Sequence, residues 1–226
     1  MDLLIAIEEA LIAKADKEEA ILMKKYMKDR FDFFGLRAPY VKEVFKQILS
    51  EYSVQPDDLK KIVTSLWDKH EREYQMIAIH LLNRYTKWLK EDDIELIEYC
   101  ITHKSWWDSV DVIATNALGS YMKAFPDHTE EIRERWLSSN NIWLQRSILL
   151  YQLKYKKETD SSILFNSILR LNESKEFFIQ KAIGWALREY SKTDAEKVIQ
   201  FVESTKLANL SKREALKWLR AKNMIH

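Results

Sequence analysis

Apolar residues recur at helical spacing along most of the chain, and four stretches show the pattern most clearly. They are "EYQMIAIHLLNRY", "DSVDVIATNALGSY", "IWLQRSILLYQLKY" and "FFIQKAIGWALREY". Apolar positions three and four residues apart line one face of a helix. The pattern predicts four amphipathic helices that end near Tyr85, Tyr121, Tyr155 and Tyr190, and "SKREALKWLR" near the end of the chain predicts a fifth.

Two residue types keep nearly the same period along the chain. The four tyrosines are separated by 36, 34 and 35 residues. A series of aspartates has separations of 35, 35, 33 and 34 residues and consists of Asp57, Asp92, Asp127, Asp160 and Asp194. The shared period indicates a repeated helical hairpin whose first helix begins at the aspartate and whose second helix ends at the tyrosine.

A helical hairpin of this length cannot bury its own apolar face, but stacked hairpins can. We therefore expect an all-α protein in which the hairpins form one curved array, with a concave side lined by one helix of each pair. The prediction is a single domain over residues 1–226. It has atypical N-terminal helices at 1–54 and repeats at about 57–85, 92–121, 127–155, 160–190 and 194–222.

Serines lie near the expected starts of the second helices, at Ser105, Ser139, Ser174 and Ser211. Ser105 with Asp108, and Ser211 with Glu214, have the spacing of a capping box, in which the two side chains bond to the free N–H groups of the first turn. Both pairs are expected to cap helices.

The composition agrees with a helical protein and excludes several other classes. Three glycines and three prolines are too few for a turn-rich β protein. The single cysteine, Cys100, excludes a disulfide framework and fits a reducing cytosol. Residues 1–20 lack the basic start and the small-residue cleavage site of a signal peptide, and the sequence contains no run of about 18 apolar residues. We therefore expect a cytoplasmic protein without a membrane span. The histidines and Cys100 have no metal-ligand spacing, and no glycine loop cradles a phosphate, so no metal or cofactor is expected.

The net charge is only +1, but the charge is unevenly distributed. Residues 1–20 carry six acidic and two basic residues, a net of −4, whereas residues 206–226 carry six basic residues and one acidic residue, a net of +5. This asymmetry favours a basic surface on one side of the molecule, although solvated helix faces can differ in charge for no functional reason.

The repeat allows each hairpin to be compared with the others. The residues ten before each tyrosine are Gln75, Asp111, Gln145 and Gln180, so a carboxylate replaces an amide in one hairpin. Four residues before Asp111, and on the same side of the helix, is Trp107, where the other hairpins have polar residues. An exposed indole beside an unexplained carboxylate suggests a ligand-binding surface, whereas Trp106 is expected in the core.

Arg146 and Trp185 are exceptions of the same kind in the following hairpins, and they can line one cleft with Asp111. Counted from the tyrosines, Asp111 and Arg146 lie at positions one apart, which differ by about 100° around a helix. Each residue alone also has a simpler interpretation: a solvated acid, a surface ion-pair partner or a packed tryptophan. Their related positions in the repeat favour a site.

Several ordered motifs resemble the DNA alkylation repair glycosylases built from HEAT-like repeats, the AlkD type. The resemblance extends from about Tyr26 to Arg220 and rests on "YMKDRFDFFGL", "LWDKHEREYQMIA", "KSWWDSVD", "NIWLQR", "QLKYK", "ESKEFFIQKAIGWALREY" and "LSKREALKWLR". It implies a right-handed α-solenoid of HEAT-like helical-hairpin repeats with a concave DNA-binding face. It also implies a monofunctional glycosylase that removes cationic N3- and N7-alkylated purines, such as 3-methyladenine and 7-methylguanine, from duplex DNA without base flipping.

The resemblance also implies roles for individual residues. Asp111 matches the catalytic aspartate of the family, and Trp107 and Trp185 match the aromatic residues that pack against the sugar of the damaged nucleotide. Arg146 matches an arginine near the aspartate and a phosphate, so it can support the carboxylate or grip the DNA. Tyr26 matches a tyrosine of the N-terminal helices that approaches the DNA.

Lysines and arginines of the concave face and of the basic C-terminal end are expected to contact DNA phosphates. The candidates are Lys181, Arg188, Lys212 and Arg213. A protein that acts on one lesion needs no partner subunit, so we expect a monomer. The alternative is a non-catalytic HEAT-like module that binds DNA structure or protein, because many repeat proteins of this fold class only bind.

Overall fold

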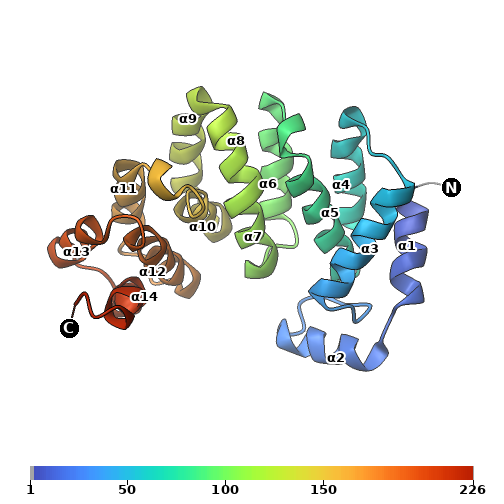
Figure 1. Ribbon diagram of the computed structural model, residues 1–226, viewed down its shortest axis with the longest axis horizontal. Coiled ribbons are helices and arrows are strands. Elements are labelled where there is room, and N and C mark those ends of the chain that lie inside the picture. Colours follow the sequence, from blue (N-terminus) through green and yellow to red (C-terminus); the bar gives the residue numbers. More distant parts are fainter. Residues whose placement is uncertain (1–2, 226) are drawn as a thin grey trace. The chain divides into compact units, whose positions relative to one another are not determined.

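A computed structural model describes residues 3–225, and within them the protein is built from helices (Figure 1). The only β contact among these residues is an isolated bridge between Asp32 and Glu71. The contacts divide the chain into two compact units, residues 1–96 and 97–226. The all-helical prediction is confirmed, whereas the assignment of all residues to a single domain stays a prediction.

The first unit contains three N-terminal helices and the first helical hairpin. The N-terminal helices are α1 (Leu3–Ala13), α2 (Lys17–Tyr26) and α3 (Ala38–Glu51). The hairpin consists of α4 (Leu59–Asp68) and α5 (Arg72–Arg84), with the 3-10 turn η1 (Pro56–Asp58) before it and η2 (Thr86–Trp88) and η3 (Glu91–Asp93) after it. Helix α3 packs against both α1 and α5.

The segment that joins α2 to α3 is fixed to α5 by a buried carboxylate. Glu73 accepts hydrogen bonds from the backbone N–H groups of Phe34, Gly35 and Leu36 at 3.0, 2.9 and 2.9 Å. Burial raises the pKa of Glu73, while the three N–H groups act in the opposite direction. Gly35 has a φ of +96°, and a Cβ at this position would lie 2.0 Å from the carbonyl oxygen of Asp16, so only glycine fits. The motif "FDFFGL" therefore has a structural role, because it attaches the segment between α2 and α3 to α5.

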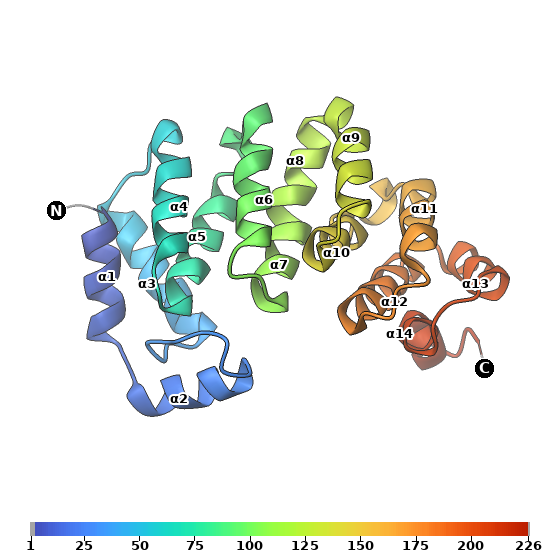
Figure 2. The same ribbon diagram turned by 180° about the vertical axis from the view of Figure 1, so that it is seen from behind.

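The second unit contains the remaining hairpins (Figure 2). The first helices are α6 (Ile94–Thr102), which begins in the first unit, α9 (Pro126–Leu137), α11 (Ser161–Leu171) and α13 (Ala195–Ser204). The second helices are α7 (Trp107–Ile113), which continues through the π-helical turn η4 (Ala114–Leu118) into α8 (Gly119–Ala124), then α10 (Ile142–Leu150), α12 (Phe177–Ser191) and α14 (Asn209–Ala221). The 3-10 turn η5 (Lys156–Glu158) precedes α11. The hairpins of this unit begin and end within three residues of the expected limits, except that α10 ends five residues before Tyr155. The division into repeats stays a prediction.

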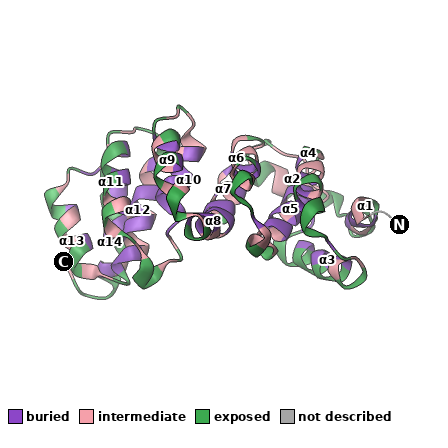
Figure 3. Cartoon of the chain, turned by 90° about the horizontal axis from the view of Figure 1, so that it is seen from above, coloured by how far each residue is buried: buried purple, intermediate pink, exposed green. Residues whose placement is uncertain are grey.

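The second helices carry most of the core of this unit. Helix α10 packs against α7, α12 and both neighbouring first helices, and α12 packs closely against α14. Figure 3 shows more buried residues along α12 than along α13. The approach of α12 to α14 requires Gly184, where a Cβ would lie 2.5 Å from the Cβ of Glu214 and 2.8 Å from the carbonyl oxygen of Ser211. These contacts fix the second helices against one another.

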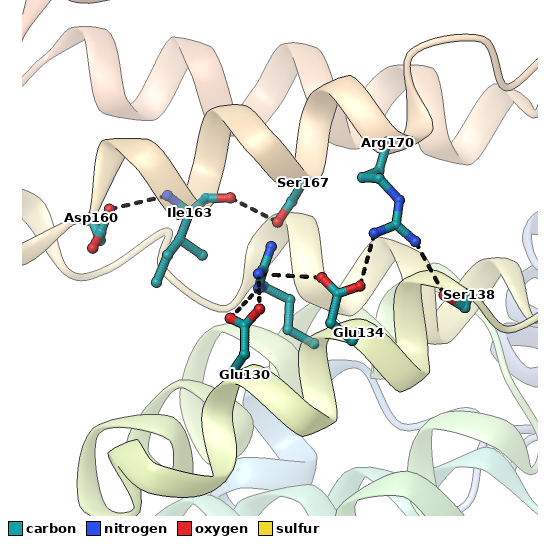
Figure 4. Close-up of polar contacts among 8 residues, drawn as sticks. Glu130, Glu134, Ser138, Asp160, Ile163, Ser167 and Arg170 are labelled. Carbon is teal, nitrogen blue, oxygen red and sulfur yellow. Dashed lines mark hydrogen bonds and ion pairs between the residues drawn. The ribbon is translucent and has the colours of Figure 1, made fainter.

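The first helices α9 and α11 are joined by polar contacts at the surface (Figure 4). Arg170 donates to Glu134 Oε2 at 2.8 Å and to Ser138 Oγ at 3.1 Å. The pair is half exposed, with 47% of the Arg170 side chain and 43% of the Glu134 side chain accessible. Exposed pairs of this kind typically add less than about 1 kcal/mol, so the apolar contacts of the second helices dominate the packing.

The helix caps agree only in part with the sequence. Asp160 caps α11 by accepting from the N–H groups of Ser162 and Ile163, and Asp194 caps α13 by accepting from Lys197 N–H. Asp57, Asp92 and Asp127 instead lie inside a first turn. The two predicted capping boxes are wrong, because the residues that precede α7 and α14 are Trp106 and Ala208. Ser105 Oγ bonds to Ile101 O and Ser211 Oγ to Gln180 O.

Candidate active site

A pocket in the second unit lies between α7, α10, α12 and α14 and has a volume of about 260 Å³. Six of the predicted site residues line it: Trp107, Asp111, Arg146, Lys181, Trp185 and Arg188. Three residues that the sequence did not indicate complete the wall: Phe177, Phe178 and Glu214. A larger pocket of about 580 Å³ lies near Tyr155 and Tyr190 and contains none of these residues.

Asp111 and Arg146 form a bidentate ion pair at the bottom of this pocket. Arg146 Nε donates to Asp111 Oδ1 at 2.7 Å, and Nη2 donates to Oδ2 at 2.8 Å. The third guanidinium nitrogen, Nη1, donates to the carbonyl oxygen of Phe178. Only 6% of the Arg146 side chain and 13% of the Asp111 side chain are accessible. Such a planar fork fixes the orientation of the carboxylate, and the burial of Arg146 leaves little surface for a DNA phosphate.

Glutamines of the other hairpins lie where the count from the tyrosines matched them with Asp111. Gln75 Nε2 donates to the carbonyl oxygens of Leu66, Trp67 and Lys69, at the end of the preceding helix. Gln145 donates in the same way to the carbonyl oxygens of Leu137, at the end of α9, and of Ser139, and Gln180 donates to that of Ser174. These amides fasten each loop to the second helix, a function that requires an N–H donor.

The sequence comparison placed Asp111 in register with these glutamines, and that alignment is wrong by one residue. In three hairpins the residue before the second helix lies 14 positions before the tyrosine: Glu71 before Tyr85, Asn141 before Tyr155 and Glu176 before Tyr190. In the hairpin that contains Asp111 the separation is 15, from Trp106 to Tyr121. The additional residue lies in the π turn η4, where Gly119 N–H bonds to Ala114 O five residues earlier. Counted from the helix start, Val110 therefore matches the glutamines.

The corrected register explains why the site residues meet. Asp111, Arg146 and Lys181 each lie five residues after the residue that precedes their helix, so they occupy the same position in three consecutive hairpins. The apparent offset of about 100° between Asp111 and Arg146 disappears. Trp107 likewise matches Arg72, Ile142 and Phe177, the first residues of their helices, instead of the polar residues that precede them.

Two side chains support the π turn directly behind the carboxylate. Thr115 Oγ1 donates to the carbonyl oxygen of Asp111 at 2.8 Å, and Asn116 Nδ2 donates to that of Val112 at 2.7 Å. They bond to carbonyl groups at the widened part of the helix. π turns occur frequently at functional sites, and here the turn follows Asp111 by three residues.

Aromatic side chains line the pocket or pack against Phe178 in its wall. Trp106 is buried, as predicted, with its ring 5.2 Å from that of Phe178 and 5.7 Å from that of Trp143. Trp107 and Trp185 are partly exposed and line the pocket. The two tryptophans therefore provide apolar faces on a pocket that contains a carboxylate.

Glu214 is the charged residue of the pocket that the sequence comparison missed. Its carboxylate accepts from Lys181 Nζ at 3.0 Å and from Arg188 Nη1 at 2.9 Å, and its side chain is 14% accessible. The hydrogen bond from Lys181, aided by the charges of both cations, lowers the pKa of Glu214. The sequence had assigned Glu214 to a helix cap, so its proximity to α12 was hidden until α12 and α14 were placed together.

The remaining predicted DNA contacts lie outside the pocket. Lys212 and Arg213 are exposed on α14 of the same unit. Tyr26 is 71% exposed at the end of α2, in the first unit. Within residues 3–225, no helix is long and apolar enough to cross a membrane, and no three acidic, histidine or cysteine side chains cluster as a metal site would require.

The fold and the pocket define a helical-repeat protein with an arginine-held carboxylate in a pocket that two tryptophans also line. The chain belongs to the DNA alkylation repair enzyme family, whose model matches residues 7–219. A structure described as a predicted DNA alkylation repair enzyme from Enterococcus faecalis is 33% identical with a TM-score of 0.84, over 91% of this chain and 96% of that one.

Two solved structures from Streptococcus mutans share the fold at lower identity. AlkD2 is 22% identical with a TM-score of 0.62, over 79% of this chain and 89% of that chain. The protein smu.31 of strain UA159 is 21% identical with a TM-score of 0.60, over 80% of this chain and 98% of that chain. No curated protein matches the chain. The family and the helical-repeat fold that the sequence predicted are thus confirmed.

Proposed function

We propose that the protein is a monofunctional DNA glycosylase that excises cationic N3- and N7-alkylated purines from duplex DNA, without base flipping. The observation that carries this proposal is the Asp111 carboxylate, held in a fixed orientation by Arg146 in a pocket that Trp107 and Trp185 also line. Membership of a DNA alkylation repair family supports a DNA substrate. We further propose that the enzyme acts as a monomer in the cytoplasm.

The chemistry of the lesion matches this set of residues. An N3- or N7-alkylated purine carries a positive charge and leaves as a neutral base, so no general acid is required. As the base departs, the sugar acquires positive charge and resembles an oxocarbenium ion. A preorganised carboxylate beside that cation lowers the barrier electrostatically, and it can also orient the attacking water and accept its proton. Asp111 has both roles in this proposal.

Arg146 acts on the carboxylate instead of on the DNA. Two of its nitrogens hold Asp111 and the third holds the Phe178 carbonyl, so the side chain has little freedom to turn toward a phosphate. More accessible cations contact the phosphates in this proposal: Lys181 and Arg188 at the pocket, and Lys212 and Arg213 on α14. Tyr26 is proposed to approach the DNA from the first unit. Affinity for duplex DNA should decrease steeply with salt, because phosphate contacts release counterions.

The tryptophans stabilise the same transition state. Their π faces attract a cation, by about 0.5–2 kcal/mol depending on desolvation. A contact that strengthens by about 1.4 kcal/mol as the sugar becomes cationic accelerates the reaction roughly tenfold. Uncharged lesions leave less readily and should be excised slowly or not at all.

The proposal is tested with a duplex that contains one N7-methylguanine. Base release is measured in single turnovers with the wild type, with Asp111→Asn, and with Asp108→Asn as a matched control. Asp108 lies on the same helix but does not line the pocket. We expect Asp111→Asn to lower the rate by roughly a hundredfold or more, as for other preorganised electrostatic groups, and Asp108→Asn to leave it nearly unchanged.

The alternative function, a repeat module that binds without catalysis, predicts a different outcome. The buried ion pair of Asp111 and Arg146 would then only stabilise the fold, and neither the wild type nor any variant would release the base. Equal release by the wild type and Asp111→Asn would also contradict the proposed mechanism.

A further inference from the structure

Glu214 brings a second carboxylate to the pocket, where the proposed reaction gives it no role. It lies on α14 and bonds across to two cations of α12, Lys181 at 3.0 Å and Arg188 at 2.9 Å. Lys181, Trp185 and Arg188 are spaced four and three residues apart, so they lie along one face of α12. Glu214 therefore bridges the cations on either side of the tryptophan.

The charges of the pocket show why a carboxylate is useful there. Asp111 and Arg146 cancel, which leaves Lys181 and Arg188 against Glu214. With Glu214 the pocket carries a net charge of +1, and without it the net charge would be +2. Excess positive charge favours DNA phosphates but opposes a sugar that becomes cationic, because like charges in a poorly solvated pocket repel strongly. The two requirements conflict, and Glu214 lies where it can balance them.

The backbone around Glu214 is fixed on both helices. The close approach at Gly184 places the Glu214 Cβ against α12, and Ser211 Oγ donates to the carbonyl oxygen of Gln180 at 2.9 Å. The two cations keep the pKa of Glu214 below its usual range. Glu214 thus presents a charged group from a rigid position.

We propose that Glu214 is a positioning residue that orients Lys181 and Arg188 toward the phosphates beside the lesion and offsets their charge where the sugar becomes cationic. This inference rests on the proposed glycosylase function. It predicts opposite effects on binding and on catalysis, which a purely structural residue would not produce.

Glu214→Gln removes the charge and keeps the size of the side chain. We expect tighter binding to undamaged duplex, with the slope of log Kd against log salt steeper by about one, because one more cation is available to phosphate. The single-turnover rate of N7-methylguanine excision should fall roughly tenfold, because the transition state loses a favourable charge. Glu189→Gln is the matched control, since Glu189 lies on α12, pairs with Lys192 directly after this helix and lines the other pocket. It should change neither quantity.

Two further variants separate electrostatics from structure. Glu214→Asp keeps the charge and should keep the rate within about threefold. The double variant Glu214→Gln with Lys181→Gln restores the net charge of +1 and should recover most of the lost rate. Loss of both affinity and rate in Glu214→Gln and Glu214→Asp, with no recovery in the double variant, would assign Glu214 a structural role and overturn the inference. An active wild type with an equally fast Glu214→Gln would overturn this inference alone, whereas a wild type that releases no base would overturn both proposals.

Discussion

Replacement of Arg146 by methionine tests the ion pair on which the site depends. The substitution removes two charge-assisted hydrogen bonds to Asp111 and one bond to the Phe178 carbonyl, and it strands a carboxylate of which only 13% is accessible. Removal of one partner of a buried pair typically costs about 3–5 kcal/mol. We expect the free energy of unfolding to decrease by about 4 kcal/mol, which is a large fraction of the stability of an ordinary domain.

The matched control is Arg170→Met, in the same unit. Arg170 also forms an ion pair and a second hydrogen bond, but 47% of its side chain is exposed. Its loss should cost less than about 1 kcal/mol. Urea unfolding followed by circular dichroism measures both variants, and the double variant Asp111→Asn with Arg146→Met should regain part of the loss, because the stranded charge is gone. Similar losses in Arg146→Met and Arg170→Met would refute the argument from burial.

Two other predictions concern the first unit. Glu73→Gln replaces one acceptor oxygen by an N–H₂ group beside the N–H groups of Phe34, Gly35 and Leu36. The free energy of unfolding should therefore decrease by about 1–3 kcal/mol. An unchanged value in urea unfolding would show that these bonds do not hold the segment against α5. His80 is stacked on Phe45, and burial, with a smaller effect of Lys42, lowers the pKa of His80 below 6.5. The unfolded chain therefore binds a proton that the folded protein does not, so stability should fall as the pH decreases below about 6.5, and His80→Phe should flatten this part of the pH profile.

The fold was predictable because its signals are local and repeated. Apolar spacing and the two periodic residue types located the hairpins to within a few residues, and Asp160 and Asp194 cap helices as expected. The serine caps failed because a serine near a helix start has other acceptors, as Ser105 and Ser211 show. Local sequence does not decide between these bonds.

The candidate site was predictable in part. Asp111, Trp107, Arg146 and Trp185 line one pocket, but the count from the tyrosines that singled out Asp111 and Trp107 is displaced by one residue in their hairpin. Glu214 breaks no pattern, since a glutamate three residues after a serine is ordinary in a helix. Its place in the pocket depends on the packing of α14 on α12, which brings Glu214 to Lys181, 33 positions earlier in the chain.

The π turn has a consequence for anyone who redesigns this scaffold. A consensus hairpin, averaged over the units of the chain, would omit the additional residue between Trp106 and Tyr121 and would place a glutamine where Val110 now lies. Such an idealised array would gain regular helices and well-fastened loops. It would also lose the irregular unit that supplies Asp111, so the regular array would lack the carboxylate on which the proposed catalysis depends.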